Sequence, residues 1–484
     1  MSEPNLRNQA LNGTIWSFVE RFSVQIVRFL LTIVIARLLT PDDYGLIGML
    51  AIFISLSQVF IDGGLSSALV QKQDRTKEDY STVFYANLIV SLVIYVLLFI
   101  SAPWIADFYK QPLLTPITRV YSLDLILNSL IAVHRTILVI KVDFKTQSKI
   151  SLISIVFSGL LGIWTAWVGW GVWALVIQLI SQTLLNIILS VWYVRWWPSW
   201  TFSMKSFRQL FSFGSRLMVA KTIHNVYTSV YNLVIGKRFT SADLGYYTKA
   251  TEFTTFAGGN ISQILQRVTF PILSQIQDDD KRLLAIYQKY IKIISFVVFP
   301  IIMLMFGTAK PMIQLLLTDK WLDCVILLQI LSFKCMWDCV IQTNINLLYV
   351  KGRSDYAMKL EIVKKIIAFT ILAITMFFNL VIICVGQVVY TLISVYMNCY
   401  YTKKILGYSF WDQIKDILPW LLLSIFVGFE SLFITMLFST PWISFVASLL
   451  VGGITYIAIS VLFKFEPYIE TYNLVKEYAV KIKR

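Results

Sequence analysis

Two stripes of polar residues interrupt apolar segments of this 484-residue chain, each at helical spacing. Arg21, Gln25 and Arg28 recur at i, i+4 and i+7, so a helix would place them on one face. The second stripe consists of Lys221, His224, Asn225, Thr228 and Asn232. Charges at membrane depth are costly unless they are paired, reach the interface or face water. The stripes therefore fit the walls of a shared cavity, where basic groups would recognise a ligand without breaking bonds.

Arg28 and Lys221 are the residues that we expect to face this cavity. The alternative is ion pairing inside the membrane that only fixes helix packing. Arg267 lies near the end of another apolar segment. It would either make the first contact with a ligand or extend its side chain to the membrane interface.

Three titratable residues have two open interpretations each. Glu20 and Asp62 would either bind a coupling cation or proton, or neutralise Arg21 and Arg28. His224 would either take part in proton coupling or serve as a hydrogen-bonded polar residue of its helix. The structural interpretation is the simpler one in each case.

The composition indicates a membrane protein. Hydrophobic residues make up 57% of the chain, charged residues 14%, and the mean hydropathy is +0.70. About 20 apolar residues span a bilayer as a helix, and the strand-like alternation of a membrane barrel is absent. We therefore predict an all-α integral membrane protein with about fourteen spans: 12-36, 45-70, 81-106, 117-140, 149-168, 172-194, 209-235, 244-271, 291-316, 322-350, 358-378, 380-402, 417-438 and 442-463.

The basic residues predict the orientation. If the N-terminus is cytoplasmic, 27 Lys and Arg residues fall on the cytoplasmic side and 5 on the other. This asymmetry predicts that both termini are cytoplasmic and that the first span is retained. The net charge of +15 is thus mainly a topology signal, and nucleic acid is not an expected partner.

A short turn occurs twice in the chain. Residues 40–48 read TPDDYGLIG and residues 240–248 read TSADLGYYT, with Thr, Asp and Gly at the same offsets. The Thr residues would cap helices and the Asp residues would lie in first turns, where a carboxylate suits the helix dipole. Paired glycines follow in each half, Gly63-Gly64 and Gly258-Gly259.

Six spans separate the two turns, so both halves enter the membrane in the same direction. Parallel repeats of this kind are typical of transporters with a site between the repeats. We predict a six-helix N-terminal lobe at 1-208, a six-helix C-terminal lobe at 209-412, and two further spans with a cytoplasmic tail at 413-484.

Several runs also resemble a known family: ARLLTPDDYGLIGM, FIDGGLSSALVQKQD, SAPWIADFY, GWGVWALV, LGYYTKA and RVTFPILSQIQDD. They are similar to polysaccharide flippases of the multidrug/oligosaccharidyl-lipid/polysaccharide exporter superfamily, near the colanic-acid-exporter branch. The resemblance covers about residues 10 to 310. It implies two lobes around a cavity that opens alternately to cytoplasm and periplasm.

The resemblance also implies the substrate, an undecaprenyl-diphosphate-linked oligosaccharide moved between leaflets of a bacterial inner membrane. Its diphosphate suits basic residues, because Arg presents a planar fork of donors to phosphate oxygens. The expected partners are this lipid-linked sugar, membrane lipids and a polysaccharide polymerase. No cofactor is expected, and coupling to H⁺ or Na⁺ stays open.

Two other functions are open. A cation-coupled drug exporter would share the superfamily. A polysaccharide ligase or polymerase would need an outer active site, and the short outer connections carry no histidine and no carboxylate cluster. We therefore expect a transporter and not an enzyme. The five cysteines lack metal-ligand spacing, so we expect buried apolar cysteines and no metal site.

Overall fold

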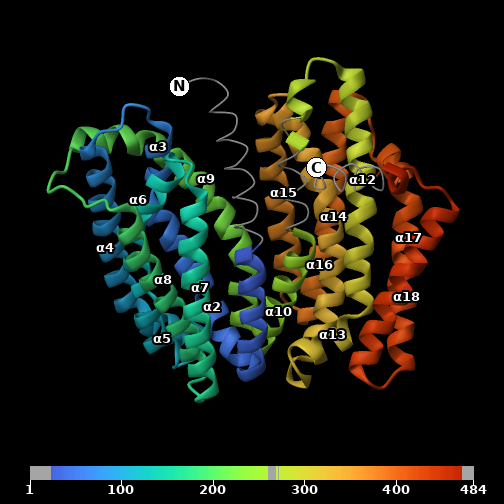
Figure 1. Ribbon diagram of the computed structural model, residues 1–484, viewed down its shortest axis with the longest axis horizontal. Helices are drawn as coiled ribbons and strands as arrows, with labels where there is room; N and C mark the ends of the chain where they lie inside the picture. Colours follow the sequence, from blue (N-terminus) through green and yellow to red (C-terminus); the bar gives the residue numbers. More distant parts are fainter. Residues whose placement is uncertain (1–22, 260–268, 271, 471–484) are drawn as a thin grey trace, which may run out of the picture. The chain divides into compact units, whose positions relative to one another are not determined.

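The computed structural model describes residues 23–259, 269–270 and 272–470 (Figure 1). The regular elements of these residues are all helices, and ten segments are long and apolar enough to cross a membrane. This confirms the prediction of an all-α, multi-pass membrane protein. The chain forms two compact units, which divide between Gly245 and Tyr246.

The N-terminal unit begins with a helix at residues 23–38. Further helices follow: α2 (Pro41–Asp62), α3 (Leu65–Gln71), α4 (Lys77–Tyr109), α5 (Leu114–Tyr121), α6 (Leu123–Ile140), α7 (Phe144–Trp167), α8 (Val172–Val194) and α9 (Met204–Arg238). The helix α10 (Ser241–Thr254) crosses the boundary between the units.

The C-terminal unit continues with a π-helical turn, η1 (Thr255–Gly259), and a 3₁₀ turn, η2 (Asp319–Trp321). Its longer helices are α12 (Asp280–Gly307), α13 (Ala309–Leu316), α14 (Cys324–Val350), α15 (Ser354–Thr375), α16 (Leu380–Leu406), α17 (Phe410–Leu437) and α18 (Pro441–Leu462).

Ten of the fourteen predicted spans coincide with apolar helical segments. In two of these, α2 with α3 and α5 with α6, a span consists of two consecutive helices. The predicted spans 209-235 and 358-378 lie in α9 and α15, which are helices of more polar sequence. The spans 12-36 and 244-271 lie partly outside the described residues.

Both repeated turns start a helix in the way the sequence predicts. Thr40 caps α2 in a capping box, in which the Asp43 backbone N–H donates to Thr40 Oγ1 and the Asp43 carboxylate accepts from the Thr40 backbone N–H. Thr240 and Asp243 make the same two contacts at the start of α10, at 3.1 Å each. The capping interpretation is confirmed for both turns.

The first glycine pair interrupts the second span of the N-terminal unit. Gly63 and Gly64 have φ values of +51° and +71°, a region that favours glycine, and they separate α2 from α3. A Cβ atom at Gly64 would lie 2.3 Å from the carbonyl oxygen of Gly214, so α9 packs there by backbone contact. In the other half, Gly258 and Gly259 lie within the π-helical segment η1. Such breaks at membrane depth are tolerated where they are buried or line a cavity.

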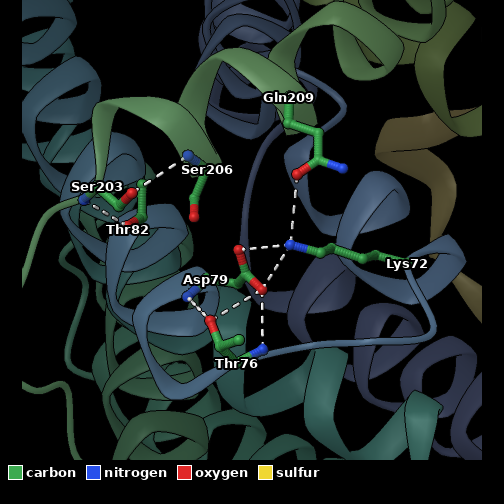
Figure 2. A network of polar contacts seen from close by, with 7 residues as sticks. All are labelled: Lys72, Thr76, Asp79, Thr82, Ser203, Ser206 and Gln209. Atoms are coloured by element: carbon green, nitrogen blue, oxygen red, sulfur yellow. Dashed lines mark hydrogen bonds and ion pairs between the residues drawn. The ribbon is translucent and has the colours of Figure 1, made fainter.

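A polar network holds the first turn of α9 against α4 (Figure 2). The carboxylate of Asp79, which is fully buried, lies 2.9 Å from Lys72 Nζ and accepts a hydrogen bond from the Thr76 backbone N–H. The Ser203 backbone N–H donates to Thr82 Oγ1 at 3.0 Å, and Ser203 caps α9. This network positions the helix that carries the second polar stripe.

The boundary between the two compact units differs from the boundary between the two predicted repeats. The repeat divides the chain after residue 208, whereas the units divide after Gly245. The difference arises because α9 packs against α2, α3 and α4. The assignment of α9 to the second repeat, and of 413-484 to a separate helix pair, stays a prediction.

Candidate functional site

A polar cavity of about 610 Å³ lies inside the N-terminal unit. Residues of α2, α3, α4, α6 and α9 form its walls. The side chains that line it carry hydroxyl, amide and charged groups: Ser55, Gln58, Asp62, Ser66, Ser67, Asn87, Asn128, Ser129, Arg135, Thr136, Lys221 and Asn225. Its volume is within the range of small-molecule sites, and apolar side chains such as Val59 and Val139 complete its lining.

One wall is a single face of α6. Asn128, Ala132, Arg135 and Val139 are spaced at i, i+4, i+7 and i+11 and all line the cavity. The side-chain nitrogen of Asn128 donates to Asp124 Oδ2 at 2.7 Å, which fixes the amide at the cavity surface.

Arg135 is the exposed cation of this wall. Its charge interacts with those of Asp124 and Arg28. Within the described residues, no carboxylate lies close enough to form an ion pair with its guanidinium. A guanidinium of this kind is available for an anion.

Asn87 on α4 is fully buried and also lines the cavity. Among the described residues, neither its side-chain oxygen nor its side-chain nitrogen has a hydrogen-bond partner. An unsatisfied buried polar group costs about 1–3 kcal/mol. The unpaired amide therefore destabilises the fold, and a polar ligand in the cavity could supply the missing hydrogen bonds.

The opposite wall contains an ion pair between helices. Lys221 Nζ of α9 lies 3.0 Å from Asp62 Oδ2 at the end of α2, and the two side chains are 46% and 24% exposed. Lys221 thus faces the cavity and is paired as well. Asp62 pairs with Lys221 and not with Arg28. On the same face of α9, Asn225 donates from Nδ2 to the Ser55 backbone oxygen at 3.3 Å.

Three other predicted site residues are described, and none of them belongs to the cavity wall. Gln25 is half-buried, Arg28 and His224 are exposed, and none of the three is among the side chains that line the cavity. Glu20, Arg21 and Arg267 lie outside the described residues. The structure therefore brings Lys221, Asn225 and Asp62 together.

Among the cavity residues missing from the predicted site, three carry the argument: Asn87, Asn128 and Arg135. For the two on α6 a signal existed, because Asn128 and Arg135 are seven residues apart and share a helical face. Asn87 gives no such signal in sequence. Its importance comes from its lack of a partner, which only the packing reveals.

Some charged groups of the C-terminal unit pair within one helix, and others pair between helices, as Lys292 does with Glu466 at 3.1 Å. Lys249, which is buried, lies 2.8 Å from Glu252. Glu361 pairs with Lys364 and Lys365 on α15. The five cysteines are buried and unoxidised, as predicted. In the part of the chain that the structure describes, no group of three His, Cys, Asp or Glu side chains is placed to hold a metal ion.

The helical fold is similar to that of two solved membrane proteins. The lipid II flippase MurJ in an inward closed conformation superposes with a TM-score of 0.77, over 93% of this chain and 98% of MurJ, at 15% sequence identity. An inward-facing multidrug transporter of the superfamily superposes with a TM-score of 0.61, over 80% and 98% of the two chains, also at 15% identity.

The chain belongs to the polysaccharide biosynthesis protein family, which matches residues 34–326. The teichuronic acid biosynthesis protein TuaB of Bacillus subtilis is 24% identical, over 73% of this chain and 74% of TuaB. The lipopolysaccharide biosynthesis protein WzxC of Escherichia coli is 23% identical, over 74% of each chain. The succinoglycan biosynthesis transport protein ExoT of Rhizobium meliloti is 25% identical, over 63% of this chain and 62% of ExoT. The resemblance seen in the sequence is confirmed.

Proposed function

We propose that this protein is a flippase that moves an undecaprenyl-diphosphate-linked oligosaccharide from the cytoplasmic to the periplasmic leaflet by alternating access. The observation that carries the proposal is the cavity of the N-terminal unit, which contains a guanidinium available for an anion and a buried amide without a partner. A relative named for succinoglycan transport and a fold shared with a lipid II flippase support it.

The basic residues would bind the diphosphate. Arg135 offers two parallel N–H donors to phosphate oxygens, and Lys221 adds a point charge. Arg28 acts on the same region through its charge. Together these groups lower the free energy of bringing an anionic headgroup to membrane depth while the polyprenyl chain stays in lipid.

The neutral polar residues would bind the sugar. Asn87, Asn128 and Gln58 present amide donors and acceptors, which match hydroxyl groups on a saccharide. Asn225 adds a further amide to this cavity. A role in substrate binding for Arg21, Gln25, His224 and Arg267 stays a prediction from the sequence.

Ion coupling is proposed at Asp62, with Glu20 as a second carboxylate. Because Asp62 holds Lys221 at 3.0 Å, a proton or Na⁺ bound to Asp62 would weaken this pair and release Lys221 to the substrate. Binding of the coupling ion would then move Lys221 from Asp62 to the diphosphate of the substrate.

The cellular setting follows from the charge asymmetry and the family. We place the protein in a bacterial inner membrane with both termini cytoplasmic, because 27 of the basic residues outside spans fall on that side and 5 on the other. A polysaccharide polymerase that consumes the translocated unit is the proposed partner.

The test is deletion of the gene in its host, followed by analysis of lipid-linked sugars. We expect the undecaprenyl-linked intermediate to accumulate on the cytoplasmic face. Complementation with R135A should leave export about tenfold or more below the wild type, because a hydrogen bond to a charged group is lost. R135K should retain part of it, and K149A, at an exposed lysine of α7, should export normally. Normal export with R135A would remove Arg135 from the site.

The second candidate is a cation-coupled drug exporter, which the fold shared with a multidrug transporter favours. It predicts that deletion raises sensitivity to cationic drugs while lipid-linked sugars stay at wild-type levels. The flippase proposal predicts the reverse, so one deletion strain distinguishes the two.

A further inference from the structure

A second cavity, of about 510 Å³, lies in the C-terminal unit where α16 is followed by α17. Its lining combines exposed aromatic rings with two lysines. Neither the predicted site nor the proposed translocation uses these residues.

The aromatic part is a platform on α16 and α17. Tyr396, Tyr400 and Trp411 are 58%, 59% and 68% exposed and all line the cavity. Tyr396 and Tyr400 are one helical turn apart, so their rings lie on one face of α16. Exposed Trp and Tyr side chains at the ends of spanning helices are typical of the lipid headgroup level.

The basic part is the last turn of α16. Lys403 and Lys404 line the cavity and are both exposed. Lys404 Nζ lies 4.9 Å from the centre of the Tyr356 ring, and the guanidinium carbon of Arg353 lies 3.7 Å from the same centre. Three cations therefore gather at this end of the unit.

The carboxylate of Asp412, the residue after Trp411, is engaged in a helix cap. Asp412 accepts hydrogen bonds from the backbone N–H of Ser409 at 3.0 Å and from its hydroxyl at 2.6 Å, in the capping box that starts α17. It attracts Lys403 through charge alone. Arg353 is paired with Asp355 at 3.0 Å, which leaves the two lysines as the cations that face the cavity.

We propose that this cavity binds the phosphate headgroup of an anionic phospholipid of the surrounding membrane. Two ammonium groups match a phosphate diester by charge, and basic pockets between spanning helices bind anionic headgroups in this way. The exposed rings would cover the glycerol region next to the phosphate. A cavity of this size holds a headgroup and leaves the acyl chains in the bilayer.

Such a lipid would connect two parts of the chain. α16 ends the second predicted six-helix lobe, and α17 begins the last helix pair. A headgroup held by Lys403 on α16 and covered by Trp411 on α17 would stabilise the junction between them.

The experiment is native mass spectrometry of the full chain in detergent with equal amounts of phosphatidylglycerol and phosphatidylcholine. We expect the wild type to retain more phosphatidylglycerol than phosphatidylcholine. Each lysine near the membrane surface contributes about 1 kcal/mol, or about fivefold in affinity, so K403Q/K404Q should bind phosphatidylglycerol about 25-fold more weakly. The charge-retaining variant K403R/K404R should bind as the wild type does.

The matched control is K149Q/K359Q, which removes two exposed lysines outside the cavity. It should retain phosphatidylglycerol. Equal retention by K403Q/K404Q and the wild type would overturn the proposal. A second outcome would also overturn it. If undecaprenyl phosphate displaces phosphatidylglycerol from the wild type but not from K403Q/K404Q, the site binds the carrier lipid and not a membrane phospholipid. A failure of the flippase proposal would leave this binding unchanged.

Discussion

Gly45 lies directly against the backbone of Ser241, so that a Cβ atom at position 45 would come within 1.8 Å of the Ser241 carbonyl oxygen. The contact is reciprocal, because a Cβ atom at Gly245 would lie 2.0 Å from the carbonyl oxygen of Pro41. Ser241 Oγ also donates to Asp42 Oδ1 at 2.5 Å. The two copies of the repeated turn therefore meet within the N-terminal unit, and the glycine of each copy permits the approach.

Replacing Gly45 with alanine should separate the two turns. The added methyl group would overlap a backbone oxygen, which cannot rotate away as a side chain would. We expect G45A to lower the thermal stability of the purified protein by several degrees. G453A is the matched control, because a Cβ atom at Gly453 in α18 meets nothing within 4 Å and alanine favours a helix. Equal stability of G45A and wild type would show that the turns do not need this contact.

Cysteines at the contact should form a crosslink. D42C and S241C replace two side chains joined by a 2.5 Å hydrogen bond, and the five native cysteines are buried and give little background. We expect mild oxidation to form the disulfide, detected by mass spectrometry of the linked peptides. If transport requires the turns to separate, oxidation should stop export and reduction should restore it. A crosslinked protein that still exports would leave these turns as helix caps only.

Exchanging the charges of Asp62 and Lys221 distinguishes ligand binding from helix packing. The pair is partly exposed, so breaking it with K221A should change stability by no more than about 1 kcal/mol. We expect export to fall much more than abundance. The exchange variant D62K/K221D restores the pair and should restore abundance without restoring export. Full recovery of export would mean that the pair only fixes the packing of α2 against α9.

Replacing Asn87 with leucine should reduce export without reducing the stability of the protein. Because both polar atoms of this buried amide lack a partner among the described residues, N87L should leave thermal stability unchanged or raise it. Export should fall, since the amide is proposed to bind the sugar.

The control is N344L in the C-terminal unit, where Asn344 exchanges hydrogen bonds of 3.0 and 3.1 Å with Gln413. N344L should destabilise by about 1–3 kcal/mol, because Gln413 would be left unpaired. Destabilisation by N87L would contradict the assignment.

The sequence by itself determined the features that depend on neighbouring residues. Runs of apolar residues identified a multi-pass helical protein, because a spanning helix satisfies its backbone hydrogen bonds within one segment. Thr40 with Asp43, and Thr240 with Asp243, defined two helix starts, because a capping box involves residues only three apart.

Only the tertiary structure decided which faces meet. Asp62 and Lys221 are 159 residues apart, and their pairing depends on how α9 packs against the end of α2. Sequence spacing placed Lys221 on a polar face but gave no means of choosing its partner. Asn87 looks like an ordinary polar residue of an apolar helix until its neighbours are known. Hydrogen-bond satisfaction is a property of three-dimensional packing, which is why the cavity and its unpartnered amide emerged from the fold alone.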